Sequence, residues 1–281
     1  MKSQLLSGRQ PLLVMAFVVA TLTLFGNLAF AEEGFLDNGV TAHRGNSSEF
    51  PENTLAAFRS GIDVGADWIE LDLYRTKDGE LVVIHDATTG RVAGVDMVVA
   101  NATYAELKKL DVATEFRQQH GLTVEQCLPR HIPTLREVLQ LVMSQQRTRA
   151  SLLPKVDCVA EAIELIKQMK AERWVGFNEG NLEYVTAVKR LAPEIPVFWD
   201  RPANTDIESD IEIALDRGFD SLVINEKGIS ADKVRRITAA GLIPGAWTVN
   251  DPETMRRFID LGVERIYTDY PRTLLQLREK K

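Results

Sequence analysis

The chain has 281 residues, with 33 basic and 40 acidic side chains and a formal net charge of −7. Its apolar share of 45% supports a buried core, and its length suits one large domain. So acidic a composition argues against nucleic acid as a partner, whereas it leaves a small-molecule substrate open, because local cations can hold a small anion.

The first 31 residues have the pattern of a secretory signal. Lys2 and Arg9 are their only charges, an apolar run extends from Leu12 to Phe25, and Ala29-Phe30-Ala31 is an A-x-A cleavage site. That run is shorter than the ~20 residues that span a bilayer. We therefore predict cleavage after this site, export to the periplasm or the medium, and a mature domain of residues 32–281 without a stable membrane span. An uncleaved membrane anchor is the alternative.

Short apolar strands and amphipathic helices alternate after this segment. A predicted strand at Val40 to His43 is followed by a helix whose apolar residues recur at helical spacing from Leu55. Gly65 is expected to close this helix, because glycine readily adopts the left-handed conformation that ends helices. Ala66 to Tyr74 is the second predicted strand.

A hairpin interrupts the alternation after the second strand. Lys77-Asp78-Gly79 joins two apolar runs, and Asp-Gly is a strong hairpin signal. Leu81 to His85 should therefore return antiparallel to the second strand, which brings His85 back toward it. A long excursion from Ala87 to Arg130 follows, with one predicted helix at Tyr104 to Leu110.

From Leu135 onward the chain alternates regularly. The expected strands are Ala150 to Val156, Trp174 to Phe177, Pro196 to Trp199, Ser221 to Asn225, Ile243 to Thr248 and Arg265 to Thr268. The expected helices are Leu135 to Gln145, Val159 to Ala171, Leu182 to Leu191, Ile207 to Arg217, Ala231 to Ala240 and Pro252 to Leu261. Such alternation requires parallel strands with crossover helices. With the hairpin arm left out there are eight units, which favours a closed (β/α)8 TIM barrel over an open sheet.

Glu70 and Asp72 are two residues apart in an apolar run, so in a strand their side chains point to one face about 7 Å apart. Two buried like charges cost several kcal/mol unless a cation or a proton compensates them. Oxygen ligands favour calcium or magnesium over zinc. We predict that both acids are metal ligands; a structural ion network with Lys155 is the alternative.

Two histidines and an arginine accompany the acids. His43 and His85 suit proton transfer, because histidine titrates near neutral pH. Arg44 offers a permanently charged fork for a phosphate oxygen. In the alternative interpretation, Arg44 only ties down a loop carboxylate, either Glu52 or Asp86.

Four motifs carry a family resemblance: His43-Arg44-Gly45, Glu52-Asn53-Thr54, Glu70-x-Asp72 and His85-Asp86. In this order and spacing they resemble the glycerophosphodiester phosphodiesterase family. Further matches are Ile132-Pro133-Thr134-Leu135, Trp247-Thr248-Val249-Asn250 and Thr268-Asp269-Tyr270-Pro271. The resemblance implies a metal-dependent (β/α)8 barrel that hydrolyses glycerophosphodiesters to glycerol 3-phosphate and an alcohol. It also implies that His43 and His85 are the acid and base, with the substrate's own glycerol hydroxyl as a candidate nucleophile.

The chain departs from the family it resembles at one place. Relatives carry Glu-x-Lys at the end of the third barrel strand, whereas here the triplet is Leu153-Pro154-Lys155. Lys155 is expected to bind the substrate phosphate or to act as a counter-ion. The nearest inward carboxylate is Asp157, displaced about 13 Å along an extended strand from the vacant position. We therefore expect a cation held by Glu70, Asp72 and water.

The remaining candidates carry weaker signals. Trp247 is expected to serve partly as core and partly as a substrate wall. Asn225, Asn250 and Asp269 lie near strand ends, where ordinary hydrogen bonding is the usual role.

Several questions stay open from the sequence. Cys127 and Cys158 can form a disulfide in an exported protein, or Cys158 can be a small buried residue. Other functions to weigh are phospholipase D-like action on another phospholipid, including sphingomyelinase D-like chemistry, and a catalytically weakened barrel that binds polyol phosphates. The residues leave the head group, the choice between calcium and magnesium, and the acid and base assignment undecided.

Overall fold

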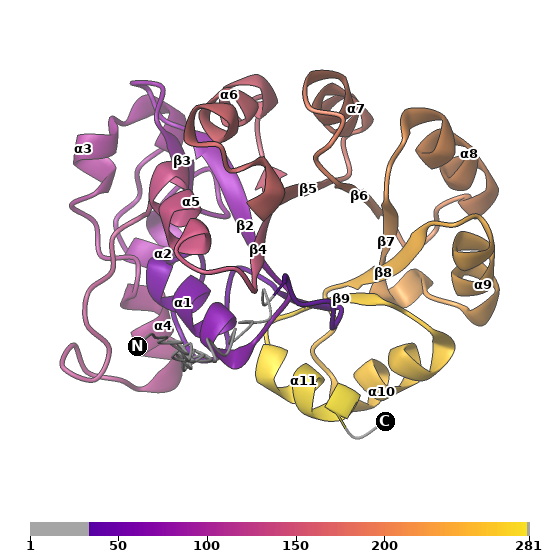
Figure 1. Ribbon diagram of the computed structural model, residues 1–281. Helices are drawn as coiled ribbons and strands as arrows, with labels where there is room; N and C mark the ends of the chain where they lie inside the picture. The colour runs from indigo at the N-terminus through magenta and orange to yellow at the C-terminus, as the bar shows by residue number, and fades with distance from the viewer. Residues whose placement is uncertain (1–33, 280–281) are drawn as a thin grey trace, which may run out of the picture. The chain divides into compact units, whose positions relative to one another are not determined.

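A closed barrel of parallel strands organises the computed structural model, which describes residues 34–279 (Figure 1). Its eight strands are β1 (Val40–Ala42), β2 (Trp68–Arg75), β4 (Arg149–Pro154), β5 (Val175–Glu179), β6 (Val197–Arg201), β7 (Ser221–Asn225), β8 (Ile243–Trp247) and β9 (Arg265–Thr268). Each pairs in parallel with the next, and β1 also pairs with β9, which closes the ring. The predicted TIM barrel is confirmed.

Helices cover the outside of the barrel. They are α1 (Leu55–Val64), α5 (Leu135–Met143), α6 (Val159–Met169), α7 (Leu182–Leu191), α8 (Ile207–Arg217), α9 (Ala231–Ala239), α10 (Pro252–Leu261) and α11 (Pro271–Glu279), with the 3₁₀ turns η2 (Glu172–Trp174) and η3 (Glu226–Gly228). Thr54 caps α1 by accepting a hydrogen bond from the Ala57 amide, and Gly65 ends it in the left-handed conformation. Local capping residues therefore fix where this helix begins and ends.

The predicted hairpin is also confirmed. β3 (Leu81–Val83) pairs antiparallel with β2, with Val83 opposite Leu73. It is shorter than predicted, because Val83 is its last residue. The Ile84 amide still donates to the Asp72 carbonyl at 3.1 Å, so the chain delivers the next residue, His85, beside Asp72.

The helix predicted from Tyr104 is present as far as Leu107, but the prediction that it is the only helix of the excursion is wrong. The structure has α2 (Gly90–Ala93), η1 (Val99–Asn101), α3 (Tyr104–Leu107) and α4 (Thr114–His120) there. None exceeds two turns, so an apolar period of 3.6 residues cannot show in the sequence. Instead, α2, η1 and α3 share a small core with β3, formed by Val82, Ile84, Val92, Val99, Leu107 and Ile132. In Figure 1 they lie beside β2 and β3.

Two strands extend further toward the barrel mouth than predicted. β5 runs on to Glu179 and β6 to Arg201, although their last residues are polar. The ladder continues nonetheless, with Glu179 opposite Trp199 and Arg201 opposite Ile224. The apolar pattern ends where the core ends, whereas backbone pairing continues to the rim. Polar side chains at these ends are therefore held on regular strands.

Besides the small core of the excursion, the barrel has two core layers. Aliphatic side chains fill the layer between the helices and the barrel, whereas Trp68, Phe198, Val223 and Tyr267 fill the barrel interior. Cys158 is fully buried in the outer layer and, like Cys127, is a free thiol.

Within residues 34–279, no helix has both the length and the apolar character needed to cross a membrane. The predicted signal segment, residues 1–31, lies outside the described residues.

Candidate active site

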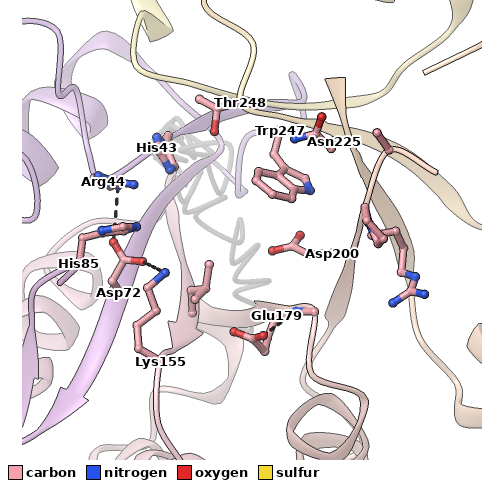
Figure 2. A pocket seen from close by; sticks show the side chains of 15 residues that line it. His43, Arg44, Asp72, His85, Lys155, Glu179, Asp200, Asn225, Trp247 and Thr248 are labelled. Carbon is pink, nitrogen blue, oxygen red and sulfur yellow. Dashed lines mark hydrogen bonds and ion pairs between the residues drawn. The ribbon is translucent and has the colours of Figure 1, made fainter. Parts of the chain in front are cut away.

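A cavity of about 510 Å³ opens at the carboxyl ends of the barrel strands (Figure 2). Six of the seven side chains predicted for the site line it: His43, Arg44, Asp72, His85, Lys155 and Trp247. The seventh, Glu70, is buried on β2, two residues before Asp72. Both acids lie inside β2 instead of at its end, because the strand continues to Arg75.

His43 follows β1, and its amide donates to the Thr268 carbonyl at 2.9 Å. Its Nδ1 lies 2.7 Å from Asp269 Oδ1, while Ser47 and Asn250 donate to the same carboxylate. Burial raises the pKa of Asp269, but the hydrogen bond and charge of His43, together with the hydrogen bonds from Asn250 and Ser47, outweigh burial and bring this pKa down to about 2. Burial lowers the pKa of His43, and the pairing with Asp269 leads the effects that raise it above its usual value. A proton on Nδ1 leaves Nε2 free for exchange with the cavity.

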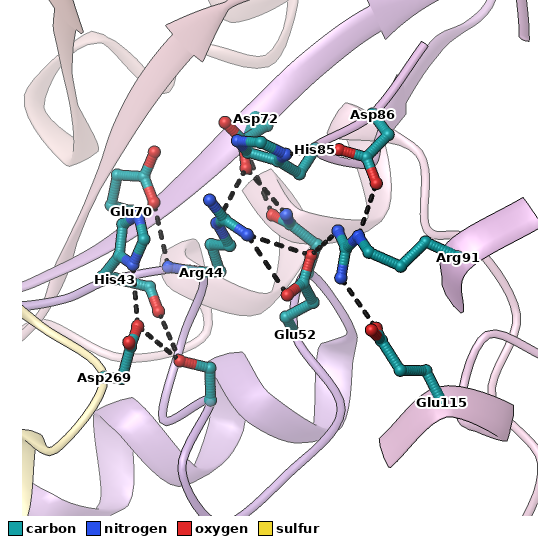
Figure 3. Close-up of polar contacts among 12 residues, drawn as sticks. His43, Arg44, Glu52, Glu70, Asp72, His85, Asp86, Arg91, Glu115 and Asp269 are labelled. Carbon is teal, nitrogen blue, oxygen red and sulfur yellow. Dashed lines mark hydrogen bonds and ion pairs between the residues drawn. The ribbon is translucent and has the colours of Figure 1, made fainter. Parts of the chain in front are cut away.

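His85 has a carboxylate partner of its own. Its Nδ1 lies 2.6 Å from Asp86 Oδ1 (Figure 3). Burial raises the pKa of Asp86, but hydrogen bonds from Arg91 and His85 outweigh burial and lower it. The cavity thus has two histidines, each oriented by one carboxylate, which is the arrangement that general acid–base chemistry requires.

Arg44 sits in a strained loop between β1 and α1. Its φ of +56° and that of Asn53, +54°, lie in the left-handed region. The Arg44 amide donates to Glu70 Oε2 at 2.9 Å, and its guanidinium donates to both oxygens of Glu52 at 3.2 Å. Asn53 Nδ2 donates to Asp72 Oδ2 at 2.8 Å. The loop therefore docks on both acids of β2, and Arg44 contacts Glu52 while also lining the cavity.

The two acids of β2 differ in their partners. Lys155 Nζ lies 3.3 Å from Asp72 Oδ1, and Arg44 Nε lies 3.6 Å from Asp72 Oδ2. Burial raises the pKa of Asp72, but Lys155 and Arg44 outweigh burial and lower it. Burial and the neighbouring Asp72 raise the pKa of Glu70 to about 7. Glu70 Oε1 is buried and has no hydrogen-bond partner among the described residues, and the Lys155 ammonium pairs with Asp72 instead.

Comparison with known proteins identifies the family. Residues 43–273 match the model of the Glycerophosphoryl diester phosphodiesterase family. The chain belongs to this family. It is 34% identical to the glycerophosphodiester phosphodiesterase of Caldanaerobacter subterraneus subsp. tengcongensis over 248 residues, which cover 86% of this chain and 98% of the relative.

Solved structures agree with this assignment. An Oleispira antarctica phosphodiesterase in complex with the product sn-glycerol-3-phosphate is 27% identical, with a TM-score of 0.74, and the match covers 85% of this chain and 96% of that one. A glycerophosphodiester phosphodiesterase from Parabacteroides distasonis, at 24% identity, shares the fold with a TM-score of 0.72, covering 88% of this chain and 99% of that one.

The departure from the glycerophosphodiester phosphodiesterase pattern on β4 is visible at the cavity. Leu153 pairs with Asp72 across the β2–β4 ladder, and both Leu153 and Lys155 line the cavity. Asp157 is exposed and does not line it. The displaced carboxylate considered from the sequence therefore lies away from the cavity.

Two other carboxylates line the cavity: Glu179 from β5 and Asp200 from β6. Figure 2 shows Asp200 pointing into the cavity below Trp247. Burial raises the pKa of Asp200 to about 8 in spite of a hydrogen bond from Asn178. Sequence reasoning missed both acids, although each follows a short apolar run at the end of a barrel strand. Within residues 34–279, no three His, Cys, Asp or Glu side chains are close enough to hold a metal ion together.

Trp247 and the asparagines take separate roles. Trp247 packs on the interior cluster and lines the cavity, so its core role is observed and its role as a substrate wall stays a prediction. Asn225 lines the cavity and caps η3 by accepting from the Lys227 amide. Asn250 Nδ2 donates to Asp269 at 2.5 Å, so it fixes the carboxylate that orients His43.

Proposed function

We propose that this member of the glycerophosphodiester phosphodiesterase family hydrolyses glycerophosphodiesters to glycerol 3-phosphate and an alcohol. One observation carries the proposal: His43 and His85, each hydrogen-bonded to its own carboxylate, line one cavity together with Arg44 and Lys155. The family places the chain among the phosphoric diester hydrolases. The Oleispira antarctica structure, which contains sn-glycerol-3-phosphate, supports the product.

Arg44 and Lys155 are the proposed phosphate-binding residues. Both line the cavity, and Arg44 Nε is buried without a hydrogen-bond partner in the described part of the chain. Asp72 holds both cations on the same side of the cavity, at 3.3 Å from Lys155 and 3.6 Å from Arg44. A phosphodiester anion bound there lies in reach of the Arg44 guanidinium and the Lys155 ammonium group.

The two histidines divide two proton transfers. One accepts the proton of the attacking nucleophile, and the other donates a proton to the oxygen of the leaving alcohol. Where the substrate's own glycerol hydroxyl attacks, a cyclic phosphodiester forms first, and water then opens it to glycerol 3-phosphate with the two histidines in exchanged roles. Asp269 and Asp86 hold the Nδ1 atoms, so each Nε2 is available for these transfers. Because the carboxylates are fixed before substrate binds, the rings need no reorientation during the reaction.

The residues at the cavity fit a hard divalent cation, calcium or magnesium. Glu70 Oε1 is a buried carboxylate oxygen without a hydrogen-bond partner, which is a position that favours a positive charge. Glu70 and Asp72 would hold the ion. When bound, it supplies positive charge to the non-bridging phosphate oxygens as charge develops there.

Replacement of Leu153 tests this assignment. Leu153→Glu should tighten calcium or magnesium binding, because an added carboxylate beside Asp72 raises the charge of the ligand set. Isothermal titration of both proteins measures the difference without any substrate. Equal or weaker binding by the variant would mean that another residue already serves as the third ligand, with Asp200 the first to test.

A second candidate activity is phospholipase D-like cleavage of a lysophospholipid. Proteins named "Lysophospholipase D" from mouse and rat are each 27% identical over 276 residues, which cover 86% of this chain. A third candidate is a catalytically weakened barrel that binds polyol phosphates, because the β4 glutamate is missing. His43, Arg44 and His85 at one cavity favour an active enzyme over this third candidate.

We also propose that the protein is exported and that residues 1–31 are its signal. The support is the sequence alone: a basic start, an apolar run and Ala29-Phe30-Ala31. An extracytoplasmic location would place the cavity among the glycerophosphodiesters released from membrane lipids.

The deciding experiment is a turnover assay over a substrate panel. Purified protein with calcium or magnesium is given glycerophosphocholine, glycerophosphoethanolamine, glycerophosphoglycerol and lysophosphatidylcholine, and glycerol 3-phosphate or the free head-group alcohol is measured. Release of glycerol 3-phosphate from a glycerophosphodiester, abolished by EDTA, supports the proposal. Turnover confined to lysophosphatidylcholine selects the second candidate. Binding of glycerol 3-phosphate without any turnover selects the third.

A further inference from the structure

Arg91 belongs to the excursion outside the barrel, yet it contacts three carboxylates, two of which pair with residues that line the cavity (Figure 3). Its Nε lies 2.5 Å from Asp86 Oδ2, its Nη2 2.6 Å from Glu52 Oε1 and its Nη1 2.7 Å from Glu115 Oε2. Each of its three nitrogens therefore faces a different acid. The three partners come from separate segments: the loop after β3, the loop between β1 and α1, and α4.

Two of these carboxylates are partners of cavity residues. Asp86 places Oδ1 against His85 and Oδ2 against Arg91. Glu52 accepts from Arg44 Nη1 and from Arg91 Nη2 with the same Oε1 atom. One guanidinium thus holds the carboxylate behind a histidine and the carboxylate behind the phosphate-binding arginine.

An isolated ion pair at this exposure contributes little to stability. The side chain of Arg91 is 35% exposed, and those of its partners are 21% to 32% exposed. The geometry differs from an isolated pair, however, because the planar fork of arginine satisfies three acids in fixed directions. If Arg91 were removed, Asp86 would keep only its contact with His85, and Glu52 would keep only its contact with Arg44. The negative charges of Glu52 and Glu115 would also lose the guanidinium that both of them contact.

We propose that Arg91 is a positioning residue for the reaction, which holds Asp86 against His85 and Glu52 against Arg44. The inference rests on the proposed function, because it concerns how that site is kept in order. This proposal gives the excursion a role: α2 carries the Arg91 guanidinium, and Glu115 of α4 anchors that guanidinium.

The test compares Arg91→Ala with a matched control. Arg236 on α9 also pairs with two carboxylates, Asp232 and Glu208, and none of these three residues lines the cavity. Arg91→Ala should lower kcat/KM roughly 10–100-fold, the size typical of losing a group that orients a ligand or catalytic residue, while Arg236→Ala stays within twofold of wild type. Arg91→Lys should recover only part of the loss, because lysine lacks the fork. Millimolar methylguanidinium should restore part of the activity of Arg91→Ala, because it can occupy the place of the missing guanidinium.

A variant cycle separates positioning from general stability. In a protein that already carries Glu52→Gln and Asp86→Asn, adding Arg91→Ala should change kcat/KM by less than twofold, because the residues through which Arg91 acts are gone. A full additional loss in that background, or a kcat/KM of Arg91→Ala within twofold of wild type, would overturn the inference. The inference would also be overturned if the loss of kcat/KM in Arg91→Ala equalled the loss of folded protein measured by circular dichroism. If wild-type protein hydrolyses no diester, the proposed function fails instead, and the two failures are distinct.

Discussion

The two histidines of the cavity take their carboxylate partners from very different distances along the chain. His85 pairs with the next residue, Asp86, whereas His43 pairs with Asp269, 226 positions away. The first pairing is visible in the sequence as a dipeptide. The second exists only because β1 and β9 are neighbours in the closed barrel.

Replacing either histidine should remove catalysis and spare metal binding. His43→Ala and His85→Ala are each expected to lower kcat by roughly 10²–10⁴-fold, the usual contribution of one general acid or base. Glu70→Ala and Asp72→Ala should lose both turnover and divalent-cation binding. Kinetics on glycerophosphocholine and isothermal titration with calcium or magnesium measure the two properties. Near wild-type turnover by either histidine variant would contradict the assigned chemistry.

The pair of His43 and Asp269 should give stability a characteristic pH dependence. The pKa of Asp269 falls from 3.8 to about 2 on folding, so its contribution of about 2 kcal/mol is present above pH 4 and is lost as pH falls through 2. The pKa of His43 is raised, so its contribution is present below 6.5 and is lost as pH rises through the folded value. Urea unfolding of wild type and Asp269→Asn should therefore differ most between about pH 4 and 6. If the difference in unfolding free energy between the two proteins were constant from pH 2 to 8, the pair of His43 and Asp269 would not be its cause.

At the scale of elements, the loop between β1 and α1 is fixed by a close approach at Gly45. Gly45 has a φ of +82°, and a Cβ there would lie 2.6 Å from the backbone of Ala57 on α1. Gly79 in the hairpin turn has a similar φ of +87°, but open space surrounds it. A comparison of alanine substitutions at the two glycines therefore distinguishes the cost of backbone strain, which both share, from the cost of a steric clash, which only Gly45 adds.

Gly45→Ala should destabilise the protein more than Gly79→Ala does. The left-handed conformation costs about 1–2 kcal/mol at either site, and only Gly45→Ala adds a clash with α1. The displaced loop also carries Arg44, so activity should fall with Gly45→Ala and stay unchanged with Gly79→Ala. Chemical denaturation and the diester assay measure both effects. Equal destabilisation by the two variants would show that α1 moves aside at little cost.

At the scale of the whole molecule, closure of the barrel assembles the cavity. β1 has only three residues, yet it pairs with both β2 and β9 and so joins the first and last parts of the described chain. His43, Glu70 and Asp269 meet for that reason. A short first strand suffices because it is paired on both edges.

The segment before this domain should be absent from the exported protein. Cleavage after Ala31 follows from the A-x-A site and the apolar run before it, so N-terminal sequencing of mature protein should begin at Glu32. Sequencing of protein purified from the exporting cells, with a cytoplasmic fraction as control, measures this. A mature protein that begins at Met1 would contradict the prediction.

The sequence by itself determined the elements whose causes are local. Ser221–Asn225, Arg265–Thr268 and α8 have the predicted bounds, because apolar runs, caps and glycines act over a few residues. The hairpin after β2 followed from Asp78-Gly79. Of the short helices of the excursion, only the one beginning at Tyr104 was predicted; α2 and η1 are stabilised by a core shared with β3 and are too short to show a periodicity of their own.

Only the tertiary structure decided which polar side chains meet. Asp200 and Glu179 line the cavity because backbone pairing carries β5 and β6 beyond their apolar residues. Arg91 reaches Glu52 and Asp86 because the excursion folds back on the rim. The apolar pattern along the chain reflects burial, which is a property of each segment, whereas hydrogen bonds and ion pairs depend on distances between segments that only the closed barrel sets.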